Sequence, residues 1–174
     1  RAFLCGFDSL SKKNYDHRKV WIRTRLQFLA SIFAVDVLAF AVMSNHLHVM
    51  LRTCLAALNA LSDREITERW LMLYPKRNND YGKPTEDEIT LLAGNPQEIE
   101  KLRARLGDVS WFMKSLNEYV ARKANKEDDC KGHFWEGRFK CKAIADEAAA
   151  LSCAIYIDLN PIRGEIAKTP EESV

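Results

Sequence analysis

The chain contains 174 residues, of which 47% are hydrophobic and 29% are charged. This composition excludes an intrinsically disordered chain, and the length is sufficient for one hydrophobic core without disulfide bonds. The net charge of +2 neither requires nor excludes a nucleic acid partner.

The sequence carries no sign of a secreted or membrane protein. Its five cysteines are scattered and form no Cys-x-x-Cys pair, as expected for reduced thiols. No apolar run reaches the roughly 18 residues of a membrane-spanning helix, and the first residues do not have the charged and apolar regions of a signal peptide. We therefore expect a cytoplasmic protein without a membrane partner.

The first half of the chain predicts a helix followed by a β-hairpin. Residues 16–34 have apolar positions at helical spacing, with Asp16 as a candidate N-cap and the basic side chains facing outward. Residues 35–43 are apolar and β-branched, which favours a buried strand. Ser44 and Asn45 predict a turn, and residues 46–53 predict the second strand of an antiparallel hairpin.

The middle of the chain predicts helices. Residues 66–73 and 86–93 form two short candidates, and residues 96–126 carry a long apolar stripe that Gly107 interrupts. Because the stretch from about 55 to 106 is irregular in pattern, we interpret it as a helical insertion on the surface of a smaller core.

The last part of the chain predicts one more strand and a final helix. Residues 139–144 favour a strand. Asp146 is a candidate N-cap for a helix through residue 155, and Asn160-Pro161 predicts its end. The order of elements predicts a single α+β domain with a small antiparallel sheet and helices on one or both faces.

A His-x-His pair stands in the second strand of the predicted hairpin. Because side chains alternate along a strand, His46 and His48 are expected on the same face, opposite Leu47. Two imidazoles within ligand reach suit a divalent metal ion if other groups complete its shell. The alternative is a pair of partly buried polar residues at a sheet edge.

Four segments in the same order resemble the HUH single-tyrosine transposases, which include the insertion-sequence-200-like enzymes and the REP-associated tyrosine transposases. The first is the strand with Asn45-His46-Leu47-His48, in which Ser44 replaces the family's proline. The resemblance spans about residues 39–170 and also includes the helix around Tyr119, the Gly132-to-Lys140 segment around Trp135, and the block from Tyr156 to Gly164 with Asn160-Pro161.

The resemblance implies a ferredoxin-like, HUH-type fold and a mechanism. Mg²⁺ or Mn²⁺ on His46 and His48 would polarise a phosphate of single-stranded or hairpin DNA, and Tyr119 would attack it to give a covalent 5′-phosphotyrosine. Such an enzyme nicks and rejoins DNA, takes no small-molecule substrate, and acts as a monomer or a homodimer. Tyr119 is alternatively a boundary aromatic residue of an amphipathic helix, although Tyr15, Tyr74, Tyr81 and Tyr156 fit the family pattern less well.

Further site residues follow from the same resemblance. The family places a polar third metal ligand about one turn after the tyrosine, but this chain has Lys123 there, which cannot ligate while protonated. Asn125 is the nearest candidate ligand. Arg138, Lys140 and Lys142 alternate on the predicted strand and would either track phosphates or form a solvated face. The complete set of candidate DNA contacts is Arg122, Lys123, Arg138, Lys140, Lys142 and Arg163.

The sequence also departs from the family. Relatives have a strand that precedes the segment corresponding to the first residues, and we expect this strand to be missing from the sheet. Lys123 in the ligand position favours an alternative function as a catalytically inactive relative that binds hairpin DNA. A replication initiator or relaxase is less favoured, because the helix around Tyr119 has one tyrosine and the chain has no phosphate-binding Gly-x-x-x-x-Gly-Lys motif. A metallohydrolase is also less favoured, because the chain contains no His-Glu-x-x-His motif.

Overall fold

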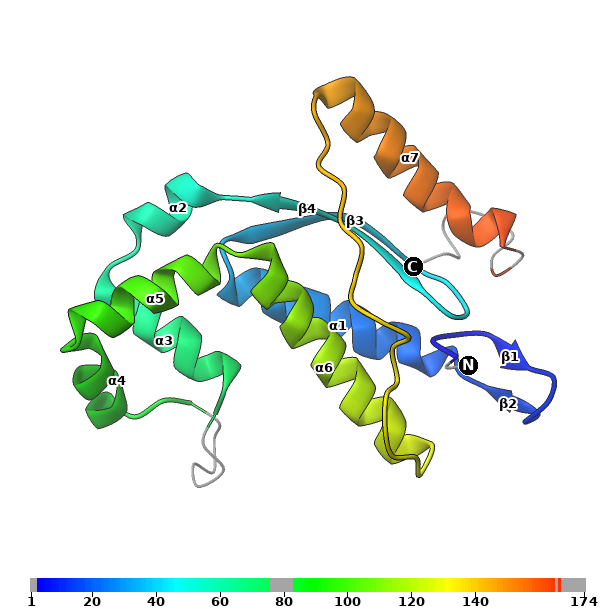
Figure 1. Ribbon diagram of the computed structural model, residues 1–174, viewed down its shortest axis with the longest axis horizontal. Helices are drawn as coiled ribbons and strands as arrows, with labels where there is room; N and C mark the ends of the chain where they lie inside the picture. The colour runs from blue at the N-terminus through cyan, green and yellow to red at the C-terminus, as the bar shows by residue number, and fades with distance from the viewer. Residues whose placement is uncertain (1–2, 76–82, 165, 167–174) are drawn as a thin grey trace. The chain divides into compact units, whose positions relative to one another are not determined.

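The computed structural model describes residues 3–75, 83–164 and 166. These residues form an α+β fold, as predicted (Figure 1). They divide between two compact units. Unit 1 consists of residues 1–26, 37–51 and 116–174, and unit 2 of residues 27–36 and 52–115. The elements are β1 (Phe7–Asp8), β2 (Lys13–Asn14), α1 (His17–Ile32), β3 (Val35–Val42), β4 (Leu47–Thr53), α2 (Leu55–Ala60), α3 (Asp63–Leu73), α4 (Glu86–Ala93), α5 (Pro96–Leu106), α6 (Val109–Glu127) and α7 (Glu147–Arg163).

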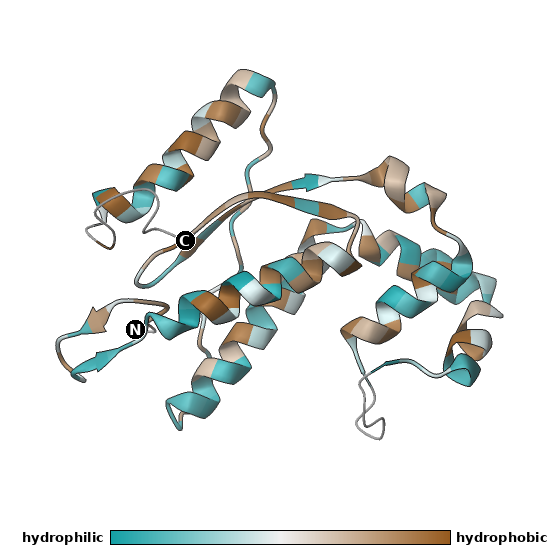
Figure 2. Cartoon of the chain, turned by 180° about the vertical axis from the view of Figure 1, so that it is seen from behind, coloured by the Kyte–Doolittle hydropathy of each residue, from teal (hydrophilic) through white to brown (hydrophobic). Residues whose placement is uncertain are grey.

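Strands β3 and β4 form the predicted antiparallel hairpin. The turn is closed by the Met43 amide, which donates to the His46 carbonyl at 2.9 Å, so that Ser44 and Asn45 occupy its two central positions. Figure 2 shows that the hairpin is hydrophobic over most of its length. Such a pattern predicts that both faces of the hairpin are covered.

Helix α7 covers one face of the hairpin in unit 1. Ile157 of α7 is buried against Ala41 of β3 and Met50 of β4. At the end of the helix the backbone of Gly164 approaches Met43 so closely that a Cβ atom would lie 2.6 Å from the methionine methyl group. Met50 faces Ile157 of α7, and side chains alternate along β4. The side chain of His48, two residues before Met50, therefore also lies on the α7 side of the hairpin.

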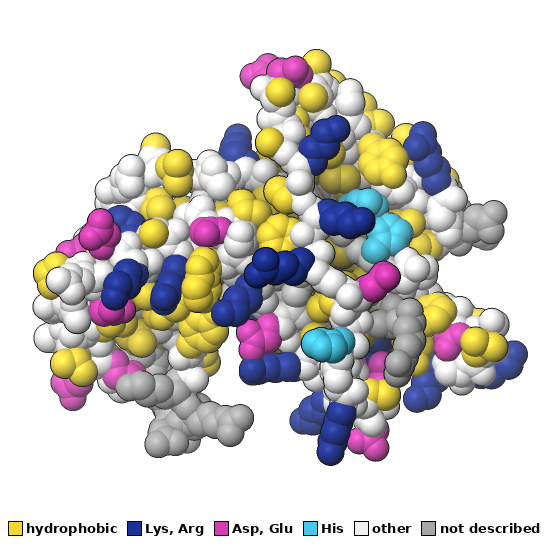
Figure 3. Space-filling model, viewed as in Figure 1, with side chains coloured by type: hydrophobic (Ala, Val, Ile, Leu, Met, Phe, Trp, Pro, Cys, Tyr) yellow, Lys and Arg dark blue, Asp and Glu magenta, His cyan; other side chains and the backbone are white. Residues whose placement is uncertain are grey.

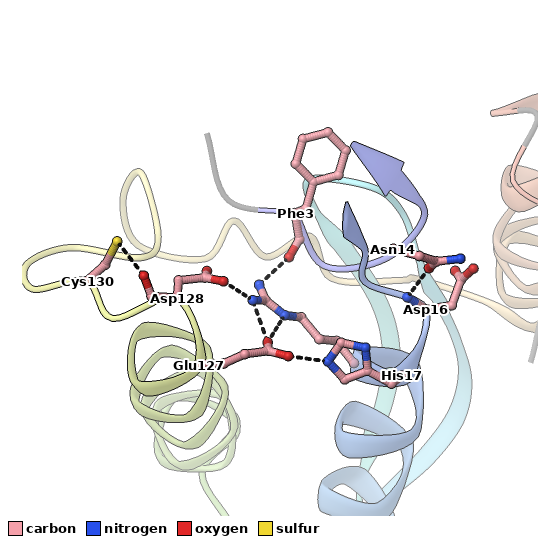
Figure 4. Close-up of polar contacts among 8 residues, drawn as sticks. Phe3, Asn14, Asp16, His17, Glu127, Asp128 and Cys130 are labelled. Carbon is pink, nitrogen blue, oxygen red and sulfur yellow. Dashed lines mark hydrogen bonds and ion pairs between the residues drawn. The ribbon is translucent and has the colours of Figure 1, made fainter. Parts of the chain in front are cut away.

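The N-terminal part of α1 and the C-terminal part of α6 belong to the same unit, and Figures 1 and 2 draw the hairpin between these helices and α7. Figure 4 shows how α1 and α6 are linked. The guanidinium of Arg18 is fully buried and donates to Glu127 at 2.7 Å, to Asp128 at 2.6 Å and to the Phe3 carbonyl at 2.7 Å. The prediction that basic residues of this helix face outward is therefore wrong for Arg18, because two carboxylates distant in sequence compensate its buried charge.

Unit 2 contains the segment predicted as a helical insertion. Helices α3 and α4 both begin with a capping box, formed by Ser62 with Glu65 and by Thr85 with Glu88. Gly107 separates α5 from α6 as predicted. A side chain at this glycine would meet Leu58 at 2.7 Å, which gives the break a packing reason as well.

Two sequence predictions near the end of the chain are wrong. Residues 139–144 form no strand within the described structure, and their side chains are exposed except for the partly buried Phe139. An exposed segment without a neighbouring strand has no partner for its backbone groups and no apolar face to bury. Helix α7 is capped by Asp146 as predicted, but it continues past Asn160-Pro161 to Arg163.

Candidate functional site

The two histidines of the hairpin converge. His46 is the last residue of the turn and His48 is the second residue of β4, and their Nε2 atoms lie 3.1 Å apart. Their rings meet edge to face with centroids 4.9 Å apart. The sequence prediction that both imidazoles lie on one face is confirmed.

Asn45 orients the first imidazole. Its Oδ1 atom lies 2.8 Å from His46 Nδ1, and since a carbonyl oxygen only accepts, Nδ1 carries the proton. The Nε2 atom of a neutral His46 then carries a lone pair, and it lies 3.1 Å from His48 Nε2. This is the arrangement in which a histidine binds a metal through Nε2 while its other nitrogen is held by a neighbouring group.

The second imidazole is biased toward its neutral form. Burial, followed by the nearby charge of His46, lowers the pKa of His48 below its ordinary value of 6.5. Neutral imidazole is the form that binds metal ions. The local environment of His48 therefore favours ligation over protonation at neutral pH.

The histidine pair fits part of a metal shell. Two nitrogens that share one ion at about 2.1 Å are separated by roughly 3.0 to 3.4 Å, depending on the coordination angle, and 3.1 Å lies in this range. Within the described residues, however, no group of three or more His, Cys, Asp or Glu side chains is placed to hold a metal. Further ligands would have to be amide oxygens, water or substrate oxygens.

Tyr119 lies in a different environment. It is partly buried on α6, its hydroxyl is 3.4 Å from the Nζ atom of Lys123, and the guanidinium carbon of Arg25 on α1 lies 4.9 Å from its ring centroid. Lys123 also lies 4.3 Å from the ring centroid of Trp21. The phenol is thus bordered by two cations, which suits a developing negative charge or a phosphate.

Among the described residues, the tyrosine in ring contact with the histidine pair is Tyr156. Its centroid lies 5.9 Å from that of His48 at an interplanar angle of 82°. Tyr156 stands on α7, whereas Tyr119 stands on α6, on the other side of the hairpin (Figure 1). The sequence analysis did not predict this contact, because nothing in the motif that contains Tyr156 indicates which strand the helix will cover.

Asn125, the candidate third ligand, lies on α6 together with Tyr119. Its amide nitrogen donates to the Gly132 carbonyl at 2.9 Å, and the Trp135 indole donates to the Asn117 carbonyl at 2.9 Å. Both bonds fasten the connection after α6 to the side of that helix. Gly132 has a φ of +103°, which favours glycine there. These contacts support a structural role for Trp135.

Most of the predicted DNA contacts are accessible. The side chain of Arg122 is 79% exposed and pairs with Glu118, and Arg163 at the end of α7 is exposed as well. Figure 3 shows Lys and Arg side chains beside histidine and hydrophobic side chains over the hairpin and α7. The remaining predicted contacts are the partly buried Lys123 and the exposed Arg138, Lys140 and Lys142, which follow an irregular connection instead of the predicted strand.

The chain matches no protein-family model, no curated protein and no solved structure. None of the helices in the described residues combines the length and the hydropathy needed to cross a lipid bilayer.

Proposed function

We propose that the chain is a metal-dependent single-tyrosine DNA transposase of the HUH type, which nicks and rejoins single-stranded or hairpin DNA in the cytoplasm. The observation that carries the proposal is the convergence of His46 and His48, with 3.1 Å between their Nε2 atoms and with Asn45 holding the ring of His46. The order of the four family-like segments supports the same assignment.

Each side chain has a role in this proposal. A Mg²⁺ or Mn²⁺ ion held by His46 and His48 would supply a Lewis acid for a phosphate oxygen. Tyr119 supplies the nucleophile. Lys123, at 3.4 Å from the phenol oxygen, attracts the phosphate and stabilises negative charge on that oxygen.

The reaction exchanges one phosphodiester bond for another. The Tyr119 oxygen forms a bond to phosphorus, the bond from phosphorus to the 3′-oxygen breaks, and the phenolic proton is transferred in net terms to the departing 3′-oxygen. The products are a 5′-phosphotyrosine and a free 3′-hydroxyl. Rejoining reverses these steps at another 3′-end, so the complete cycle requires no external energy source.

The proposal is tested by incubating the protein with a 3′-labelled hairpin oligonucleotide that has a single-stranded flank, with Mg²⁺, Mn²⁺ or EDTA; the 3′ label stays on the fragment that becomes attached to the tyrosine. We expect a denaturation-resistant adduct only with a divalent ion. Tyr119→Phe should abolish the adduct while preserving oligonucleotide binding, because it removes only the hydroxyl. His46→Ala should abolish it as well.

Two outcomes would count against the proposal. Tight hairpin binding without an adduct under any ion condition would identify the inactive DNA-binding relative, which Lys123 in the ligand position favours. An adduct that persists in Tyr119→Phe would assign the nucleophile to another residue.

A further inference from the structure

Tyr156 is an aromatic residue that the packing of α7 does not use. The helix is held on the hairpin by Ile157, which is 3% exposed, whereas the neighbouring Tyr156 is 48% exposed. Its hydroxyl has no hydrogen-bond partner among the residues that the structure describes. A tyrosine that serves packing has a buried ring, and one that serves a buried hydrogen bond has a buried hydroxyl. Tyr156 fits neither description.

The position of the ring is nevertheless defined by two neighbours. His48 contacts it edge to face from β4, with centroids 5.9 Å apart. Arg163 lies two helical turns further along α7, on the same helix face, and its guanidinium carbon is 5.8 Å from the Tyr156 centroid. The accessible ring therefore stands between the histidine pair and an exposed cation.

An accessible aromatic ring with an adjacent guanidinium binds single-stranded nucleic acid well. Bases stack on aromatic rings without regard to their identity, and arginine contacts the phosphate of the same strand. A base in a duplex has both faces covered by its neighbours, so only an unpaired base is available for such a contact.

We infer that Tyr156 and Arg163 form a nucleotide subsite that stacks one unpaired base of a single DNA strand beside the His46–His48 pair. This inference rests on the proposed function for the choice of DNA as ligand. The stacked nucleotide would be a neighbour of the scissile phosphate, because the Tyr156 ring contacts the ring of His48 directly. Tyr156 is in this role a positioning residue, and its hydroxyl takes no part in bond formation.

The test measures the Kd of a fluorescent single-stranded oligonucleotide by anisotropy in EDTA, where no cleavage is required. Tyr156→Ala should weaken binding by about 5- to 150-fold, the range that loss of one base stack produces. Tyr156→Phe retains the ring and should remain within about twofold of the unsubstituted protein. Tyr74→Ala is the matched control, because Tyr74 is 42% exposed and belongs to unit 2.

Each result either supports or overturns the subsite. A loss of binding confined to Tyr156→Ala supports it, even if the unsubstituted protein forms no covalent adduct and the proposed enzymatic function fails. The inference is overturned if Tyr156→Ala binds as tightly as Tyr74→Ala, if the unsubstituted protein does not bind the strand, or if Tyr156→Phe binds DNA but loses the adduct. The last result would make Tyr156 the nucleophile instead of a stacking residue.

Discussion

The Nζ atom of Lys123 lies 3.4 Å from the hydroxyl oxygen of Tyr119, one turn earlier on α6. The resemblance to the transposases places a metal ligand at the position of Lys123, and a protonated lysine cannot serve as one. We propose a different role for this residue, as a fixed positive charge at the phenol.

We expect Lys123→Met to slow single-turnover adduct formation by about 10- to 100-fold, because the substitution removes a charge that stabilises the reacting oxygens. Lys126→Met, an exposed charge loss on the same helix, should change the rate by much less. Rates of adduct formation at saturating DNA separate this effect from binding. Equal losses in the two variants would indicate a general effect of net charge on DNA binding.

Asn45→Ala is expected to reduce metal affinity. The Asn45 side chain holds the Nδ1 proton of His46 and so leaves Nε2 available, and loss of such a supporting contact typically lowers metal affinity by about 10- to 100-fold. The Mn²⁺ concentration for half-maximal nicking measures the change. Ser44→Ala, in the same turn, is the control and should leave this concentration unaltered.

Helix α6, which carries Tyr119, and α7, which packs on the histidine side, lie on opposite sides of the hairpin in Figure 1. We therefore expect the proposed catalytic groups to come from two copies of the chain. A mixture of Tyr119→Phe, which keeps the histidines, and His46→Ala, which keeps the phenol, should form the adduct that neither variant forms alone. The adduct should appear on the His46→Ala chain, which is distinguished by a size tag. If the unsubstituted protein is active and the mixture is inactive, the site is formed within one copy.

Arg18→Met is expected to lower the free energy of unfolding by about 3 kcal/mol, because it leaves two carboxylates without the buried guanidinium that compensates them. Urea unfolding measures the change. The matched control is Arg52→Met, whose ion pair with Asp36 is exposed on both sides and contributes little in water. Similar urea midpoints for the two variants would show that the buried cluster makes no special contribution.

The buried thiol of Cys5 predicts a loss of stability in alkali. The Cys5 thiol donates to the Val42 carbonyl at 3.3 Å, and burial raises its pKa from 9.0 to about 11. Above pH 9 the thiol of the unfolded chain loses its proton, while the thiol of the folded chain stays protonated. The stability contributed by this group is therefore complete below pH 9 and is lost as the pH rises through the folded-state pKa of about 11. The slope contributed by this one group is at most about 1.4 kcal/mol per pH unit.

The measurement is urea unfolding between pH 8 and pH 11, in reducing buffer. Cys5→Ala should show a shallower decline than the unsubstituted protein, while Cys130→Ala, an exposed thiol, should not alter the decline. A decline unaffected by Cys5→Ala would assign the alkaline sensitivity to other groups.

Features that depend on residues close together in the sequence were predictable from the sequence. The hairpin and the convergence of His46 and His48 follow from strand alternation and a two-residue turn. The break at Gly107 and the cap at Asp146 also follow from local rules for helix ends. These are interactions between residues a few positions apart, so the order of amino acids contains the information directly.

Features that depend on long-range contacts required the tertiary structure. Arg18 and Glu127 are 109 residues apart, and no sequence pattern indicates that a carboxylate will meet this arginine in the interior. Residues 139–144 have the composition of a strand, yet they form none in the described structure, because a strand also requires a partner.

For the candidate site, residue types and their spacing were enough to propose the reacting groups, an imidazole pair on one face of the hairpin and a phenol on a helix. Which side chains meet depends on the tertiary structure. It packs α7 on the histidine side of the hairpin, through Ile157 against Ala41 and Met50, and thereby brings Tyr156 to His48. The physical reason is that burial of an apolar helix face sets which side chains become neighbours, and burial is a property of the whole fold.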